Sequence, residues 1–339
     1  MSNRNINKEE LYLRLIEEEY NNQLSRMDIP RDQLTNTIKD FKDDFELKIR
    51  QIILEETRES FDINIEIITS IESNIGTGSG YDGTAIRLYS EKDNLDSLIV
   101  VSQGSQDIKD WEYNLQSLFA GLTVSQAADA RTFVNHVKNK VNLTKKSSTI
   151  GLSHSLAHNN NLTAQLTNKN ERLFDEIYSV NSAQTNYYQL YFEDYEFREK
   201  VSRNFPLTYN DYMAIYDLDP NELHDFAQEY YKDKIPVVNQ RISTDDPLYA
   251  LNTARGFFQL GNIEYIDTNP DYPGLHSIMS KLPDDIVKDI QSIAIDYTTV
   301  ANLNGTNAGI KEITGIDFDL IKSESKVEYV LNIPELNHM

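Results

Sequence analysis

A serine stands at a predicted strand-to-helix turn in residues 148–158, which read Ser-Thr-Ile-Gly-Leu-Ser-His-Ser-Leu-Ala-His. Such a turn lifts the hydroxyl of Ser155 above the edge of a sheet, where it can act as a nucleophile. The residues two positions before and after this serine must be small, because their side chains crowd each other. They are Ser153 and Ala157, a relaxed form of the usual G-x-S-x-G pattern. The segment therefore predicts acyl transfer through Ser155.

A second segment predicts the hydrogen-bond donors that acyl transfer needs. The short apolar run at 97–102 is followed by Gln103, Gly104 and Ser105. A loop after such a strand is where oxyanion-hole donors lie in hydrolases with this type of turn. We therefore expect the backbone N–H groups of Ser105 and Leu156 to converge on a substrate carbonyl oxygen. An ordinary Gly-Ser turn is the alternative interpretation.

The elements that must position these residues alternate between strands and helices. Alternation of this kind predicts an α/β fold, in which helices cover both faces of a mostly parallel sheet. Strands are expected at residues 63–67, 84–89, 97–102, 148–152, 176–180, 235–239 and 263–266, and helices at 125–141 and from 156 onward.

Two further helical regions are predicted outside this alternation. Residues 1–60 form a helical extension, because apolar residues recur every three to four positions from residue 8. We expect it to pack on the sheet domain of residues 61–339, and binding of a protein partner is the alternative. Residues 184–232 are rich in tyrosine, phenylalanine and acidic residues, and they predict a helical, lid-like insertion in that domain.

Charge and composition exclude several classes of function. A net charge of −22 repels phosphate backbones, so nucleic-acid binding is not expected. The absence of cysteine excludes disulfides, thiolate metal sites and cysteine nucleophiles. No run approaches the roughly 20 apolar residues of a membrane-spanning helix. Residues 1–19 lack a signal-peptide core, so a cytoplasmic location is expected, with non-classical export as the alternative.

Residues 75–285 resemble the class 3 (fungal-type) lipase family of α/β-hydrolases, as a divergent bacterial relative. Residues 80–85, Gly-Tyr-Asp-Gly-Thr-Ala, resemble the segment that enters the family's first core hairpin. Residues 100–105, together with the Asp-Trp pair at 110–111, resemble its oxyanion strand. Residues 150–157 keep the His-Ser-Leu of its G-H-S-L-G-G turn. The resemblance implies the α/β-hydrolase fold and hydrolysis of carboxylic esters.

The chain departs from the family pattern at two places. Ser153, Ala157 and His158 replace glycines around the nucleophile, and these changes are sterically tolerable. Gln103 replaces an arginine that precedes Gly104 in the family, and this change can weaken the anchoring of the loop. A non-catalytic interaction protein on a degenerate hydrolase scaffold is therefore the alternative function.

The resemblance also implies a catalytic triad in the chain order Ser, Asp, His. His276, in a loop after the expected strand at 263–266, is the expected general base. The family's acid commonly lies in an Asp-Pro step after an earlier strand, which indicates Asp246, with Asp245 as the alternative. His276 would then take the proton of Ser155, and Asp246 would orient the imidazole. An aromatic lid and an acidic surface favour hydrophobic, uncharged ester or lipid substrates.

A metal-dependent hydrolase is a third interpretation. His154 and His158 are four residues apart, so one helical turn could present both to zinc. The chain has no His-Glu-x-x-His motif, and His154 lies at the turn itself. We therefore expect neither a metal nor a cofactor.

Overall fold

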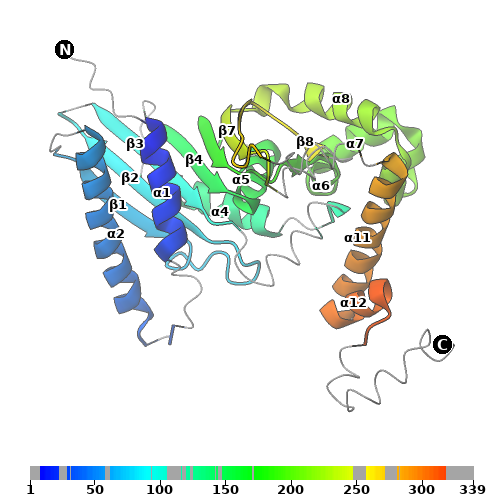
Figure 1. Cartoon of the computed structure of the whole chain (residues 1–339), viewed down its shortest axis with the longest axis horizontal. Coiled ribbons are helices and arrows are strands. Elements are labelled where there is room, and N and C mark those ends of the chain that lie inside the picture. Colours follow the sequence, from blue (N-terminus) through cyan, green and yellow to red (C-terminus); the bar gives the residue numbers. More distant parts are fainter. Residues whose placement is uncertain are drawn as a thin grey trace.

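The computed structural model describes residues 8–22, 29–30, 32–57, 62–92, 94–104, 116, 120–122, 125–141, 143, 147–169, 172–246, 257–271, 281 and 283–317. A seven-stranded sheet with the order β1-β2-β3-β4-β5-β7-β9 runs through the molecule (Figure 1). The strands are β1 (Asn64–Thr69), β2 (Gly83–Ser90), β3 (Leu95–Ser102), β4 (Ser148–His154), β5 (Glu176–Val180), β7 (Val237–Ser243) and β9 (Asn262–Ile266).

The sheet is antiparallel on one side and parallel on the other. Strands β1, β2 and β3 pair antiparallel, whereas β3, β4, β5, β7 and β9 run parallel to one another. The prediction of an α/β fold with a mostly parallel sheet flanked by helices is therefore confirmed. The carboxyl ends of five strands consequently meet at one edge of the sheet.

Alternate residues of the central strands belong to two separate hydrophobic clusters. In β3, Leu98 and Val100 contribute to one cluster, and Ile99 and Val101 contribute to the other. This division follows from the strand geometry, because successive side chains point to opposite faces. Helices α4 and α5 cover the first face, and α1 and α2 cover the second (Figure 1). These helices are α1 (Lys8–Asn22), α2 (Leu34–Thr57), α4 (Ser125–Lys140) and α5 (Leu156–Thr167).

The two N-terminal helices share a core with the sheet. Leu15, Phe45 and Ile49 are completely buried, and they belong to the same cluster as Ile86 and Leu152 of the sheet. Burial of each such side chain contributes about 1.5–3 kcal/mol. The buried apolar residues of α1 and α2 therefore pack against the sheet.

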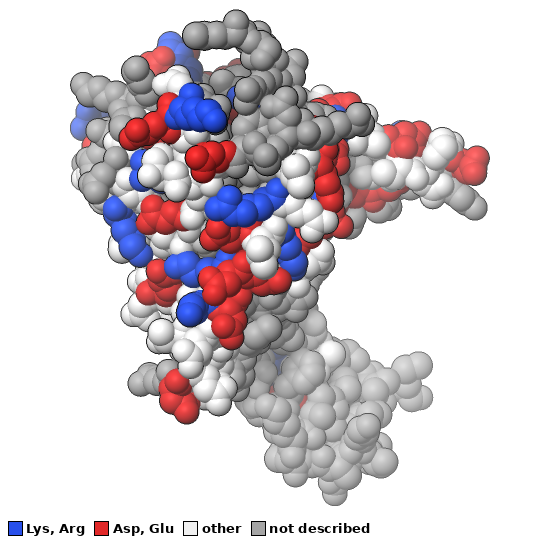
Figure 2. Space-filling view, turned by 90° about the vertical axis from the view of Figure 1, so that its left-hand side faces the viewer, with Lys and Arg blue, Asp and Glu red and all other residues white. Residues whose placement is uncertain are grey.

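Ion pairs join α1 to α2 on the outer side of this layer. Arg14 Nη2 lies 2.7 Å from Glu55 Oε2, and Lys48 Nζ lies 3.3 Å from Glu18 Oε2. Figure 2 shows acidic and basic residues interspersed over this side of the molecule. Because opposite charges alternate here, this side offers no continuous basic surface for a phosphate backbone.

The region between β5 and β7 contains short helices, as its composition predicts. These elements are β6 (Thr185–Asn186), α6 (Tyr187–Glu193), α7 (Tyr195–Asn204), α8 (Pro220–Tyr231) and three 3₁₀ turns (Pro206–Tyr209, Tyr212–Asp217 and Lys232–Lys234). Strand β6 pairs with β8 (Phe257–Phe258) in a separate two-stranded sheet.

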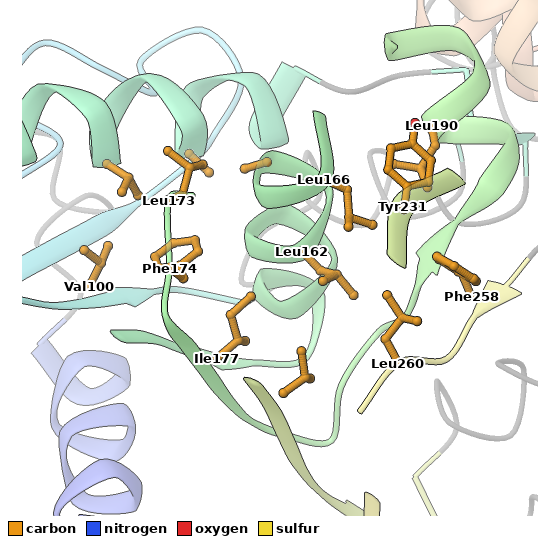
Figure 3. Close-up of a cluster of buried hydrophobic side chains, with 14 of the residues drawn as sticks. Val100, Leu162, Leu166, Leu173, Phe174, Ile177, Leu190, Tyr231, Phe258 and Leu260 are labelled. Atoms are coloured by element: carbon orange, nitrogen blue, oxygen red, sulfur yellow. The ribbon is translucent and has the colours of Figure 1, made fainter. Parts of the chain in front are cut away.

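Four tyrosines of this insertion lie in the hydrophobic core. Tyr187, Tyr188, Tyr191 and Tyr231 are at most 2% exposed and belong to the core cluster that contains α5. Figure 3 shows Tyr231 among the other side chains of this cluster. The lid-like role expected of the insertion stays a prediction. Aromatic rings bury large areas, and here they fill the core.

A helical hairpin follows the sheet at the end opposite α1 and α2 (Figure 1). It consists of α11 (Asp284–Asn304) and α12 (Thr306–Thr314), which meet at Gly305 with a φ of 90°. Among the described helices of the chain, none combines the length and the apolar character needed to cross a bilayer.

Candidate active site

Ser155 has a strained backbone at the junction between β4 and α5. Its φ is 56° and its ψ is −128°. In the described part of the chain, the other non-glycine residues with positive φ are Asn74, Asn94 and Asn181. Asparagine is enriched at positive φ, whereas serine has no comparable tolerance. Such strain costs about 1–3 kcal/mol and persists where the surrounding structure enforces it, commonly at active sites.

The turn at Ser155 is held by hydrogen bonds of its backbone. The Ser155 N–H donates to the carbonyl oxygen of Val180 at 3.1 Å, which ties the turn to the end of β5. Its own carbonyl oxygen accepts from the N–H groups of His158 and Ala183, each at 3.1 Å. Ser155 is half-buried, and its hydroxyl does not cap α5.

Gly104 at the end of β3 lies directly against this turn. A Cβ atom at Gly104 would meet the His154 carbonyl oxygen at 2.6 Å and the Ser155 Cβ at 3.1 Å. Only a residue without a side chain permits such an approach. Strand β3, which precedes the expected oxyanion loop, therefore ends next to Ser155.

One of the two expected oxyanion donors can be placed. Leu156 is the first residue of α5, so its N–H is not used by the hydrogen-bond pattern of the helix. The positive end of the helix dipole adds to the attraction of an anion there. Ser105, the other expected donor, lies outside the described residues.

Asp246 follows β7, which lies two strands away from β4, the strand that precedes Ser155. The Asp246 N–H donates to the Ser243 carbonyl oxygen at 3.1 Å, in a turn at the carboxyl end of β7. The side chain of Asn181 links this end to β5, because its Oδ1 accepts from the Ser243 N–H at 2.9 Å. Strand β7 extends to Ser243 and begins at Val237, whereas the sequence predicts residues 235–239. The strand therefore brings the Asp245–Asp246 pair directly to the sheet edge.

The two candidate acids differ in their surroundings. Asp245 Oδ2 accepts a hydrogen bond from the Thr268 hydroxyl at 2.9 Å, in the segment after β9. Thr268 also lies 2.6 Å from the Ser243 hydroxyl, so Asp245 takes part in a local network on the surface. His276, the expected base, lies outside the described residues.

The two histidines near Ser155 in the sequence, His154 and His158, both have lowered pKa values. Burial lowers the pKa of His154, whose ring lies edge-on to Tyr20 of α1 at 5.2 Å between centroids. Burial lowers the pKa of His158 to about 3, and neither of its ring nitrogens finds a hydrogen-bond partner among the described residues. In the same part of the chain, no three histidine or carboxylate side chains gather as a metal site. The geometry thus lends no support to the metal interpretation of His154 and His158.

Beneath the nucleophile lies a set of buried amides that sequence reasoning missed. All twelve residues of α5 are buried, including Asn159, Asn160 and Asn161. The Ser102 hydroxyl donates to Asn161 Oδ1 at 2.8 Å, and Asn161 Nδ2 donates to the Leu152 carbonyl oxygen at 3.4 Å. Asn161 thereby fastens β3 and β4 to the helix that follows Ser155.

A second pair of amides fixes the opposite side of α5. Asn159 Nδ2 donates to Gln189 Oε1 at 3.0 Å, and Gln189 Nε2 donates back to Asn159 Oδ1 at 3.1 Å. Buried amides are costly unless they are paired, so this reciprocal contact holds α6 in one position against α5. The sequence did contain one signal of these buried amides. Asparagine is a poor helix former, yet three asparagines follow one another near the start of a predicted helix.

A cavity of about 400 Å³ lies elsewhere, beneath the N-terminal end of α1. Its lining includes Tyr178, Arg241 and Glu264 from the middle of β5, β7 and β9. The Arg241 guanidinium already pairs with Glu9 at 2.8 Å and with Glu264 at 3.0 Å. Because two carboxylates neutralise this cation, the cavity is not suited to anions, and Ser155 is not among its lining residues.

Comparison with known proteins places the chain in a family. The family model described as "Domain of unknown function (DUF6792)" matches residues 10–267. A relative from Bacillus subtilis (strain 168), "Putative uncharacterized protein YvcB", is 37% identical over 344 residues. The match covers 98% of this chain and 52% of the relative, so the chain spans about half the length of that protein. No solved structure matches the chain significantly. Because the family model covers both the N-terminal helices and the strands around Ser155, the chain belongs to the DUF6792 family.

Proposed function

We propose that this protein is a serine hydrolase that cleaves carboxylic esters through an acyl-enzyme on Ser155. The observation that carries the proposal is the strained φ of 56° at Ser155, between a parallel strand and a helix. In the α/β-hydrolase fold, a serine on such a turn is the nucleophile. The proposal includes that fold and a kinship with class 3 lipases.

The proposed mechanism assigns a role to each of the expected site residues. Ser155 attacks the ester carbonyl carbon, and His276 takes its proton and passes it to the departing alcohol. Asp246 orients the imidazole and stabilises its cation. The N–H groups of Leu156 and Ser105 hold the negative charge on the carbonyl oxygen, and each such donor is worth about 3–4 kcal/mol. Water then releases the acid from Ser155.

The preferred substrates are uncharged, hydrophobic esters. A net charge of −22 disfavours substrates with several negative charges near the reacting carbonyl. Since four insertion tyrosines fill the core, short acyl chains suit the site better than long ones. A cytoplasmic location is part of the same proposal.

The test uses a covalent probe and a chromogenic substrate. We expect a fluorophosphonate to label the wild-type protein and not Ser155→Ala, with the added mass located on Ser155 by peptide mass spectrometry. We also expect hydrolysis of p-nitrophenyl butyrate to disappear in the same variant. Circular dichroism must show both proteins folded. If the folded wild type is neither labelled nor active, the alternative of a non-catalytic interaction protein replaces this proposal.

A further inference from the structure

The last turn of α1 lies against the nucleophile end of the sheet. The carboxyl of Glu19 is 2% exposed, and its Oε1 accepts from the Thr84 hydroxyl at 2.7 Å. The Gln103 amide donates both to this oxygen at 3.3 Å and to the Glu19 carbonyl oxygen at 3.2 Å. The next residue of α1, Tyr20, packs on His154. Two successive residues of α1 thus contact residues next to Gly104 and Ser155.

Gln103 links Glu19 to the backbone that approaches the nucleophile. Its N–H donates to the Asp82 carbonyl oxygen at 3.0 Å, and its side chain is bound by Glu19. The residue after it is Gly104, which lies against Ser155. Both ends of Gln103 are therefore anchored immediately before the loop that is expected to carry the oxyanion donor.

We propose that Glu19 is a positioning residue that acts through Gln103 to hold Gly104 against the turn of Ser155, so that α1 supports the catalytic centre. This inference rests on the proposed function, because the position of Gly104 matters for catalysis only if Ser155 reacts. Glu19 touches neither the substrate nor Ser155, and it acts through the amide of Gln103.

The protonation of Glu19 indicates which variants are informative. Burial and the neighbouring Asp82 raise the pKa of Glu19 to about 8, so the carboxyl is largely neutral near pH 7. The groups that face it are Asp82 before β2, Thr84 in β2 and Gln103 after β3. A glutamine at position 19 keeps the oxygen that accepts from Thr84 and Gln103, and it removes only the ionisation.

The experiment compares Glu19→Ala, Glu19→Gln and the control Glu18→Ala in the full chain. Glu18 lies on the same helix and pairs with Lys48 on the surface, so its loss perturbs α1 without touching Gln103. We expect Glu19→Ala to lower the rate of fluorophosphonate labelling of Ser155 by about 10- to 100-fold, since small misplacements of catalytic groups have effects of this size. Glu19→Gln should recover most of the rate, and Glu18→Ala should match the wild type.

Steady-state kinetics separate positioning from general destabilisation. With p-nitrophenyl butyrate, Glu19→Ala should lower kcat and leave KM nearly unchanged, because a displaced Gly104 disturbs the turn that carries the reacting hydroxyl of Ser155. If Glu19→Ala does not fold, Gln103→Ala tests the same contact from its other end, with the same expected loss. A folded Glu19→Ala or Gln103→Ala that is labelled at the wild-type rate overturns the inference. Absence of labelling in the wild type instead overturns the proposed function itself.

Discussion

A Cβ atom on Gly104 would lie 3.1 Å from the Cβ of Ser155 and 2.6 Å from the preceding carbonyl oxygen. The second neighbour is backbone and cannot turn away as a side chain would. We therefore expect Gly104→Ala to separate the oxyanion strand from the nucleophile turn. Stability should fall by about 1–3 kcal/mol, as for other overpacked sites, and labelling of Ser155 should fall as well.

The control for this change is Gly78→Ala. Gly78 is exposed, and a Cβ atom there meets nothing within 4 Å. Urea unfolding and fluorophosphonate labelling of both variants provide the measurement. If Gly104→Ala has the same stability and the same labelling rate as Gly78→Ala, Gly104 does not lie as close to Ser155 as described.

Strain at Ser155 predicts that two inactive variants differ in stability. Alanine at φ 56° is as strained as serine, whereas glycine adopts positive φ freely. Ser155→Gly should therefore be more stable than Ser155→Ala by about 1 kcal/mol or more, although both lack the nucleophile. Chemical denaturation of the two variants measures this difference. Equal stabilities, or a less stable glycine variant, would show that the turn carries no strain.

The two adjacent aspartates should differ in their importance for catalysis. If the proposed function holds, Asp246→Asn is expected to lower kcat by about 10⁴-fold, as loss of the orienting carboxylate does in serine proteases. Asp245→Asn should have a much smaller effect, because Asp245 is engaged by Thr268 at the surface. Rates of p-nitrophenyl butyrate hydrolysis by the two variants decide between them. The reverse order of effects would make Asp245 the triad acid.

His158 predicts a loss of stability at acid pH. Burial lowers its pKa from 6.5 to about 3, so between these values the unfolded chain binds a proton that the folded protein does not. The free energy of unfolding should therefore fall as the pH drops from about 6.5 toward 3. His158→Leu, which has no titrating group, should lose less stability over this window.

The measurement is urea unfolding at several pH values, with His224→Leu as the control. The side chain of His224 is 37% exposed, so this variant removes an imidazole that is not buried. If His158→Leu follows the wild-type pH profile, the buried imidazole does not become protonated on unfolding as described.

The alternation of strands and helices, and with it the turn at Ser155, could be predicted from the amino-acid sequence. Hydrophobic periodicity is a local property, so β3, β4 and the start of α5 were predictable close to their observed bounds. The small residues Ser153 and Ala157 also indicated a tight turn at Ser155. The position of β7 was displaced by a few residues, because its pairing with β5 and β9 carries the strand on to Ser243.

The distant residues that support the turn at Ser155 become apparent only in the tertiary structure. Glu19 and Gln103 are 84 positions apart, and no local pattern links a helical glutamate to a glutamine after a strand. The tyrosines of the insertion read as a lid, yet Tyr187 and Tyr231 fill the core. Burial depends on which surfaces meet after the chain folds. The sequence around an amphipathic residue such as tyrosine therefore does not determine whether it will be buried or exposed.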